Sequence, residues 1–143
     1  TFPEIARYVI QEAQPGDLVI GADTIVVLND QVLGKPHDQA HALEMLTALS
    51  GREHHVYTGV AALQNGRELA QVEDTAVWFR DASEAELNRY IATGEPMDKA
   101  GAYGIQGRGG LLVSRIEGDY STLVGLPIVR LASMLAQFGV TVL

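Results

Sequence analysis

Two long apolar segments joined by Asn65-Gly66 constrain the fold more than any other feature of this sequence. An Asn-Gly pair readily adopts the positive φ angles of a two-residue turn and is a strong short-range hairpin signal. We therefore expect residues 56–63 and 68–79 to form two adjacent antiparallel strands. A sheet that contains this hairpin cannot be wholly parallel.

Helix signals alternate with further strand signals along the rest of the chain. Ser83 and Glu86 have the spacing of a capping box, in which each side chain satisfies a free amide of the other residue. Together with the hairpin, this alternation predicts an α/β fold with a mixed, partly antiparallel sheet flanked by helices. Further strands are expected at residues 18–20, 24–28, 31–33 and 111–116, and helices beginning near Pro3, Asp38, Ser83 and Pro127.

The composition is typical of one soluble domain, which we expect to span residues 1–143. The net charge of -8 argues against a nucleic-acid polymer as a partner, because such a partner needs a basic surface. A nucleotide remains compatible, since it needs only a local group of donors. The lack of cysteine excludes disulfides and thiolate zinc sites, and no apolar run approaches the roughly 18 residues of a membrane span. We expect a cytoplasmic protein that contacts no membrane.

The segment from Asp98 to Gly107 concentrates glycine with side chains suited to recognition. Glycine permits positive φ angles and lets the backbone approach a ligand closely, at a high cost in conformational entropy. This combination favours nucleotide recognition, and an ordinary glycine-rich turn is the alternative. The glycines are Gly101, Gly104 and Gly107, and the side chains between or beside them are Asp98, Lys99, Tyr103 and Gln106.

Asp23 and Lys35 are candidates for contact with a ligand. Asp23 follows the apolar run 18–20, and α/β sheets place ligands at the ends of strands, where a carboxylate can hold a cation or accept a proton from water. A turn-forming aspartate bound by local amides is the alternative. Pro36 holds Lys35 extended, so that this lysine can reach phosphate oxygens; a solvated surface lysine is the alternative.

Two histidine pairs resemble metal ligands at first sight. His54 and His55 are adjacent on an expected strand, so their side chains point to opposite faces and cannot easily share an ion. His37 and His41 have helical i, i+4 spacing but no third ligand nearby in the sequence. We therefore expect neither pair to form a metal site.

Several motifs stand in a fixed order between residues 18 and 138. The longest is Gly-Glu-Pro-Met-Asp-Lys-Ala-Gly-Ala-Tyr-Gly-Ile-Gln-Gly at 94–107, and another is Gly-Ala-Asp-Thr-Ile-Val at 21–26. The others lie at residues 34–36, 49–52, 57–60, 118–120 and 124–127. With these motifs the chain resembles the Maf family of nucleoside triphosphate pyrophosphatases. The resemblance implies the curved sheet of the Maf and inosine triphosphatase-like folds.

The resemblance implies a hydrolase that splits a nucleoside triphosphate between its α and β phosphates, with Mg²⁺ or Mn²⁺ as a cofactor. The Ala-Asp-Thr and Tyr-Gly-Ile-Gln-Gly motifs resemble the branch that acts on dTTP, UTP and modified pyrimidine nucleotides. Such chemistry needs a cation, a base that orients water, and cationic groups on the leaving pyrophosphate. By resemblance, Asp23 activates water with the metal, Thr24 and Gln106 select the base, Lys35 meets the phosphates, and Asp98 and Lys99 line the pocket.

Family members begin with a strand and a Ser-x-Ser-Pro-Arg-Arg loop that has no counterpart in this sequence, which starts at Thr1. A glutamate that follows the loop also lacks a counterpart, and Ile5 stands where the family has the lysine of Glu-Lys-Ala. We therefore expect a Maf-like domain truncated at its amino terminus. A fragment of a longer protein, a natural short form, and a site completed by another chain all stay open.

Two other functions are compatible with the same residues. Loss of the phosphate-binding arginines would leave a nucleotide-binding module with weakened or no turnover. The family is also associated with septum formation and cell division, which implies a regulatory role. Because the family is often dimeric, a homodimer is a further expectation.

Overall fold

The computed structural model describes residues 13–143, which divide into two compact units. Unit 1 contains residues 13–24, 57–74 and 119–143, and unit 2 contains residues 25–56 and 75–118. The helix expected near Pro3 lies outside the described residues. The single-domain organisation stays a prediction.

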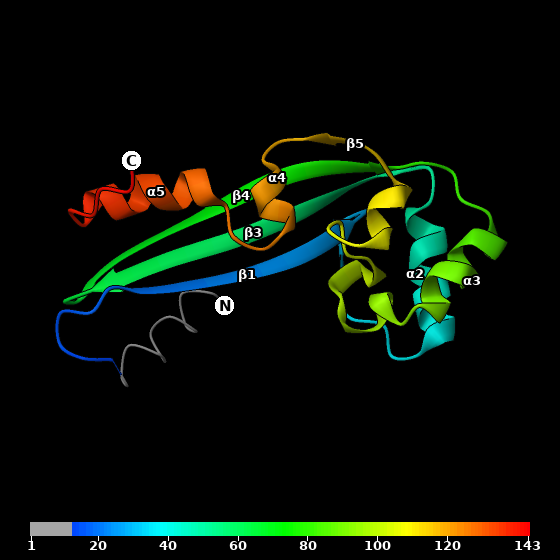
Figure 1. The fold of residues 1–143 in the computed structure, drawn as a ribbon, viewed down its shortest axis with the longest axis horizontal. Coiled ribbons are helices and arrows are strands. Elements are labelled where there is room, and N and C mark those ends of the chain that lie inside the picture. Colours follow the sequence, from blue (N-terminus) through cyan, green and yellow to red (C-terminus); the bar gives the residue numbers. More distant parts are fainter. Residues whose placement is uncertain (1–12) are drawn as a thin grey trace. The chain divides into compact units, whose positions relative to one another are not determined.

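Within residues 13–143, five strands form one sheet in the order β2-β1-β3-β4-β5. Strand β1 pairs with β2 in the antiparallel sense, as does β4 with β5. The predicted fold class, a partly antiparallel sheet flanked by helices, is therefore confirmed. The strands are β1 (Val19–Leu28), β2 (Gln31–Leu33), β3 (Glu53–Gln64), β4 (Arg67–Phe79) and β5 (Val113–Glu117) (Figure 1).

Two short turns fix the order of neighbouring strands. Asn65 and Gly66 have φ angles of 50° and 79°, the left-handed values that a two-residue hairpin between β3 and β4 requires. Asn29 and Asp30, with φ angles of 50° and 64°, turn the chain from β1 into β2. The Asn65-Gly66 turn was expected from the sequence, and asparagine and aspartate tolerate this conformation better than most residues.

Two strand boundaries differ from the sequence-based expectation. Residues 18–20 and 24–28 were expected to be separate strands, but β1 runs without a break from Val19 to Leu28. Burial alternates along much of β1, so that Ile20 is exposed although Val19 and Gly21 are buried. The last strand begins at Val113, because the preceding residues, 108–112, form a 3₁₀ helix.

The helices begin at the expected caps. The Asp38 side chain accepts a hydrogen bond from the His41 amide at 2.7 Å, and Ser83 and Glu86 form the predicted capping box. Helices α2 and α3 pack against each other in unit 2 (Figure 1). The helices are α2 (Gln39–Leu49), α3 (Glu84–Ala92), α4 (Tyr120–Leu123) and α5 (Ile128–Gln137).

One buried core cluster of unit 1 lies between helix α5 and strand β3. Leu131 and Met134 of the helix pack on Val60 and Ala62 of the strand, and these side chains are at most 9% exposed. Burial of a leucine, methionine or valine side chain contributes about 1.5–3 kcal/mol, so this contact holds α5 on the sheet. Gly139, with a φ of 81°, follows the end of the helix.

Candidate active site

Asp23 lies in the middle of β1 and is exposed. The expectation that it projects from the end of a strand is wrong, because β1 continues for five residues to Leu28. One carboxylate oxygen, Oδ1, accepts a hydrogen bond from the Thr24 amide at 3.0 Å. Since no other donor within residues 13–143 contacts this carboxylate, Oδ2 is open to a cation or a water molecule.

Thr24 is the first member of a chain of hydroxyl hydrogen bonds in unit 1. The Thr58 hydroxyl donates to the Thr122 carbonyl oxygen at 2.7 Å, which commits its single proton. The Thr24 hydroxyl lies 2.8 Å from that of Thr58 and must therefore donate to it. Because its own proton is used, the Thr24 oxygen can offer a ligand only an acceptor.

Lys35, Asp98 and Lys99 come together in unit 2. The Lys99 ammonium donates to Asp98 Oδ1 at 2.7 Å, and this hydrogen bond together with the charge of Lys99 lowers the pKa of Asp98. The charge of Lys35 lowers the same pKa further, so Lys35 lies within electrostatic reach of Asp98. The Gly101 amide donates to the Gly34 carbonyl at 3.1 Å and ties the Lys35 loop to the glycine-rich segment.

Gln106 is exposed in the turn between two 3₁₀ helices, η2 (Ala100–Ala102) and η3 (Arg108–Leu112). The Gly107 amide closes this turn by donating to the Gly104 carbonyl at 3.3 Å. No hydrogen bond occupies the Gln106 side chain in the part of the chain from Ala13 onward. Its amide is therefore free both to donate to a ligand and to accept from it.

The turn that carries Gln106 is held by Glu95, a residue of the 3₁₀ helix η1 (Glu95–Asp98). The Glu95 carboxylate accepts hydrogen bonds from the Arg108 and Gly109 amides, each at 3.0 Å, and from the Tyr90 hydroxyl. Tyr90 in turn accepts from the Gly104 amide at 3.1 Å. Burial opposes ionisation of Glu95, but the hydrogen bonds outweigh it and hold its pKa below the usual value.

Several glycines of the segment lie against protein atoms. A Cβ atom at Gly107 would overlap Glu95 Oε1, and one at Gly109 would lie 2.6 Å from the Tyr90 hydroxyl. Gly101 has a φ of 74°, and a Cβ there would lie 3.0 Å from a Val26 methyl group. Close approach of the backbone to other protein groups, rather than to a ligand alone, therefore accounts for these glycines.

Sequence reasoning assigned no role to Glu95, although the residue stands inside the longest motif. Its partners follow 13 and 14 residues later, and no local spacing rule connects a carboxylate with amides at that distance. The position of Glu95 beside the glycines was the one sequence signal for this role. A carboxylate there can accept hydrogen bonds from the backbone amides that a tight turn leaves unpaired.

The two adjacent histidines face opposite sides of β3, as expected. His54 is 1% exposed, and its Nε2 lies 2.7 Å from the Tyr103 hydroxyl. Burial and the neighbouring His55 lower the pKa of His54 to about 4, so it is neutral at pH 7. His55 is partly exposed and pairs with Glu53 at 3.1 Å. Among residues 13–143, no group of three His, Cys, Asp or Glu side chains is placed to hold a metal ion.

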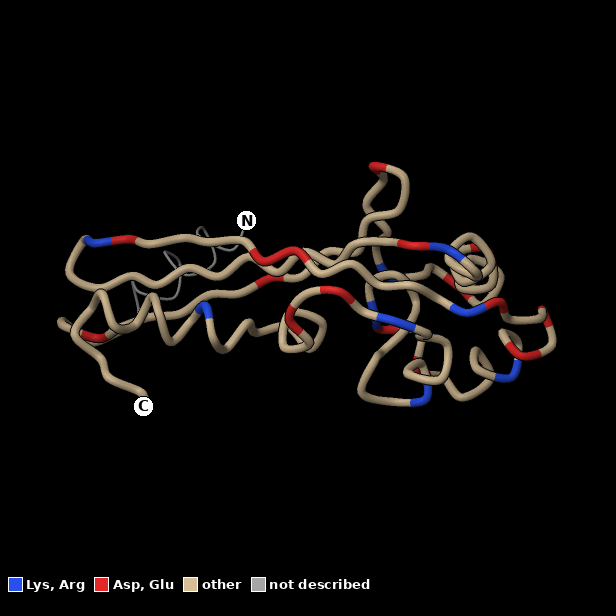
Figure 2. Tube along the Cα trace, turned by 90° about the horizontal axis from the view of Figure 1, so that it is seen from above, with Lys and Arg blue, Asp and Glu red and all other residues tan. Residues whose placement is uncertain are grey.

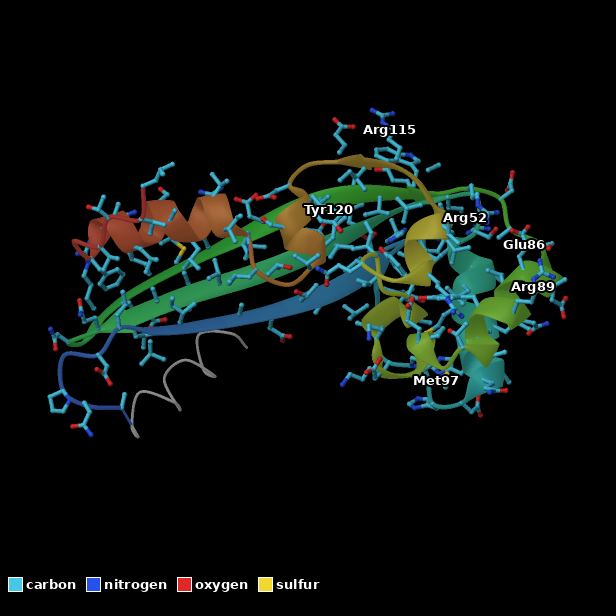
Figure 3. The ribbon with its side chains drawn as sticks, in the orientation of Figure 1. Arg52, Glu86, Arg89, Met97, Arg115 and Tyr120 are labelled. Carbon is cyan, nitrogen blue, oxygen red and sulfur yellow. The ribbon has the colours of Figure 1, made fainter. Side chains whose placement is uncertain are left out.

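Basic residues gather in unit 2 (Figure 2). A groove of about 490 Å³ in this unit is lined by polar and apolar residues, which include Lys35, Arg52 and the exposed Glu44. Arg52 is labelled in Figure 3. Such a groove offers an anionic ligand two cationic groups. In the described chain, Lys35, Arg52, Arg80, Arg89, Lys99, Arg108 and Arg115 belong to unit 2, and Arg67 and Arg130 to unit 1.

Comparison with known families identifies the class of protein. A family model described as Maf-like protein matches residues 4–138. The chain therefore belongs to the Maf family, as its motifs had indicated. No helix within residues 13–143 is both long enough and apolar enough to cross a membrane.

Individual relatives carry a more specific name. The chain is 51% identical over 136 residues to a dTTP/UTP pyrophosphatase of Dictyoglomus turgidum, a match that covers 94% of this chain and 70% of that protein. A protein of the same name from Moorella thermoacetica is 58% identical over 127 residues, covering 87% of this chain and 66% of its own length. For the protein of Symbiobacterium thermophilum the identity is 55% over 125 residues, covering 87% and 64%. The chain thus spans about two thirds of the length of these curated relatives.

Proposed function

We propose that this chain acts on dTTP and UTP, hydrolysing each to the nucleoside monophosphate and pyrophosphate. The observation that carries the proposal is its identity of 51–58% to proteins named dTTP/UTP pyrophosphatase. The matches cover 87–94% of the chain. The chemistry of the described side chains supports the same reaction in three respects: base selection, phosphate binding and metal binding.

Base selection would depend on Thr24 and Gln106. Thymine and uracil present a ring N–H between two carbonyl oxygens, whereas cytosine presents an unprotonated ring nitrogen at the same place. The Thr24 oxygen, whose proton goes to Thr58, accepts from an N–H but repels a ring lone pair. The free amide of Gln106 can pair with a carbonyl oxygen. An unpaired polar group costs about 1–3 kcal/mol, which corresponds to roughly 5- to 150-fold discrimination.

Phosphate binding would depend on the cationic groups of unit 2. Lys35 is exposed, and Lys99 is partly exposed beside Asp98. Lysine ammonium groups form charge-assisted hydrogen bonds with phosphate oxygens, and these bonds are stronger than neutral ones. In a chain with a net charge of -8, such a local group of cations is what an anionic substrate needs.

Metal binding would depend on the open carboxylate oxygen of Asp23. Mg²⁺ usually keeps several waters and is bound by one or two carboxylates together with substrate phosphates. The single exposed carboxylate of Asp23 therefore suits Mg²⁺, which does not need a site made entirely of protein ligands. When bound, Mg²⁺ or Mn²⁺ neutralises charge on the phosphates. Asp23 would orient the attacking water and accept its proton.

The test measures pyrophosphate release from dTTP, UTP, CTP and GTP by the 143-residue chain, with Mg²⁺ or Mn²⁺ and with a chelator. We expect turnover of dTTP and UTP in preference to CTP and GTP, and its loss with the chelator. Asp23→Asn should lower turnover by about 100-fold or more, because it removes the base.

The matched control is Asp30→Asn, which makes the same chemical change in an exposed turn where asparagine tolerates the backbone conformation. It should leave turnover within about twofold of the parent chain. Binding of dTTP without release of pyrophosphate, or equal turnover in Asp23→Asn and Asp30→Asn, would contradict the proposal.

A further inference from the structure

A second cavity of unit 2 contains none of the residues assigned to the reaction. It has a volume of about 290 Å³ and lies between helix α3 and the 3₁₀ helix η3. Glu86 and Arg89 project from α3 (Figure 3). The lining residues are Arg80, Glu86, Arg89, Tyr90, Thr93, Arg108, Leu111 and Leu112.

Arg80 forms a fixed wall of this cavity. Its Nε donates to the Leu111 carbonyl at 2.7 Å, and one terminal nitrogen donates to the Asp81 carbonyl at 3.1 Å. The other terminal nitrogen pairs with Glu86 at 2.8 Å. All three guanidinium nitrogens are therefore engaged, and the one acidic side chain of the lining is neutralised by Arg80.

The positive charges of Arg89 and Arg108 are not paired with any negative charge in residues 13–143. Neither guanidinium has a hydrogen bond or an ion pair with any group in residues 13–143, and both side chains are exposed at the cavity. Two like charges directed to one small cavity repel each other, and this arrangement occurs in a chain whose net charge is -8. An anion in the cavity would relieve the repulsion and occupy two guanidinium forks.

The lining of the cavity also contains apolar side chains. Leu111 is 74% exposed, and Leu112 and Tyr90 are buried. An exposed leucine alone is common on proteins, but here it adjoins two unpaired cations in one concave site. Pockets with apolar walls and a few polar groups that converge are typical of small-molecule sites.

We propose that this cavity binds a small phosphate monoester whose phosphate is attached to an apolar or aromatic ring. The phosphate would lie between Arg89 and Arg108, and the ring would cover Leu111. The volume of about 290 Å³ is near the lower end of the range for ligand pockets, which favours a ligand of one ring over a dinucleotide. The inference does not depend on the reaction assigned to Asp23.

The cavity shares two residues with the hydrogen bonds that hold the Gln106 turn. Tyr90 lines the cavity and donates its hydroxyl proton to Glu95, and Arg108 lines it while its backbone amide donates to Glu95. A ligand bound to the Arg108 side chain would therefore contact a residue two positions from Gln106.

The test follows the methyl NMR signals of Leu111 and Leu112 during titration with phenyl phosphate, inorganic phosphate and dTMP. We expect phenyl phosphate to shift these signals saturably and to bind at least about tenfold more tightly than inorganic phosphate. Arg89→Gln and Arg108→Gln should each weaken binding about tenfold or more, because each removes a charged hydrogen bond to the phosphate. In Leu111→Ser, the affinity for phenyl phosphate should become close to the affinity for inorganic phosphate.

The control is Arg115→Gln, which removes one positive charge from an exposed site where Arg115 pairs with Glu117 at 3.2 Å. It should change the affinity less than about twofold. Equal weakening by Arg115→Gln and Arg108→Gln, or no saturation below about 10 mM phenyl phosphate, would overturn the proposal. If dTMP shifts the same methyl signals, the ligand source is a nucleotide; if only phenyl phosphate does, it is another monoester.

Discussion

The Thr24 hydroxyl donates to the Thr58 hydroxyl at 2.8 Å, and this direction is fixed by Thr58, whose own proton goes to the Thr122 carbonyl at 2.7 Å. Thr58 and Thr122 are fully buried. A backbone carbonyl thus determines, through one intervening side chain, that Thr24 presents an acceptor. If Thr24 contacts the base, Thr58 therefore determines that Thr24 can only accept a hydrogen bond from it.

Thr58→Val should therefore relax base selection. The valine has the same shape but cannot receive the Thr24 proton, so the Thr24 hydroxyl becomes free to donate as well as to accept. We expect the ratio of UTP to CTP turnover to fall several-fold, and the free energy of unfolding to fall by about 1–3 kcal/mol because the Thr122 carbonyl loses its donor. Steady-state turnover and urea unfolding check the two effects.

Thr58→Ser is the matched control, since it keeps the hydroxyl and removes only a methyl group. It should retain the ratio of UTP to CTP turnover. A ratio that drops equally in Thr58→Ser and Thr58→Val would show that packing, and not the direction of the hydrogen bond, matters at this position.

Glu95→Gln should destabilise the glycine-rich segment. A glutamine has one acceptor oxygen in place of two, so it cannot accept from both the Arg108 and Gly109 amides in their present positions. The expected loss is about 1–3 kcal/mol in the free energy of unfolding at pH 7, measured by urea denaturation. Glu44→Gln, a change on the exposed side of α2, should change stability by less than about 0.5 kcal/mol.

The pH dependence gives a second test of the same carboxylate. Because the folded-state pKa of Glu95 lies below its usual value of 4.5, its contribution is present above pH 4.5 and is lost as pH falls through the folded-state pKa. The stability difference between the parent chain and Glu95→Gln should therefore shrink as pH falls below 4.5. A difference that stays constant across this range would contradict the assignment.

Features that depend on a few neighbouring residues were predicted well from the sequence. The Asn65-Gly66 turn and the capping box of Ser83 and Glu86 are fixed by local chemistry within four residues. Features that depend on distant partners were not. Gly21 lies within a strand that sequence reasoning divided, and strand pairing keeps the backbone extended there.

The residues of the candidate site also fall into those that the sequence indicated and those that it did not. Asp98 and Lys99 were assigned by resemblance, and the structure pairs them directly at 2.7 Å. Their role toward a substrate stays a prediction. Glu95 was missed, because its function depends on amides brought close by a turn whose shape no sequence pattern specifies. The glycines were visible in the sequence, but the groups they approach were not.

Gly109→Ala tests whether these glycines are required by packing. A Cβ at Gly109 would lie 2.6 Å from the Gly104 carbonyl oxygen and 2.6 Å from the Tyr90 hydroxyl, so either the turn or Tyr90 must move. Overpacking of this kind costs about 1–3 kcal/mol, and we expect thermal unfolding to show that loss. Gly34→Ala is the control, since a Cβ there has no neighbour within 4 Å, and it should be near neutral.

His54 should make the stability of the chain depend on pH between about 4 and 6.5. Burial and the charge of His55 hold its folded-state pKa near 4, so in this range the unfolded chain binds a proton that the folded chain does not. Stability therefore falls as pH drops from 6.5 towards 4, by about 3 kcal/mol in total.

Urea unfolding at several pH values, compared between the parent chain and His54→Gln, measures this effect. Glutamine can still bond to the Tyr103 hydroxyl but does not titrate, so the slope of stability against pH between 4 and 6.5 should decrease. An unchanged slope in His54→Gln would mean that the buried histidine takes up its proton in the folded state as readily as in the unfolded one.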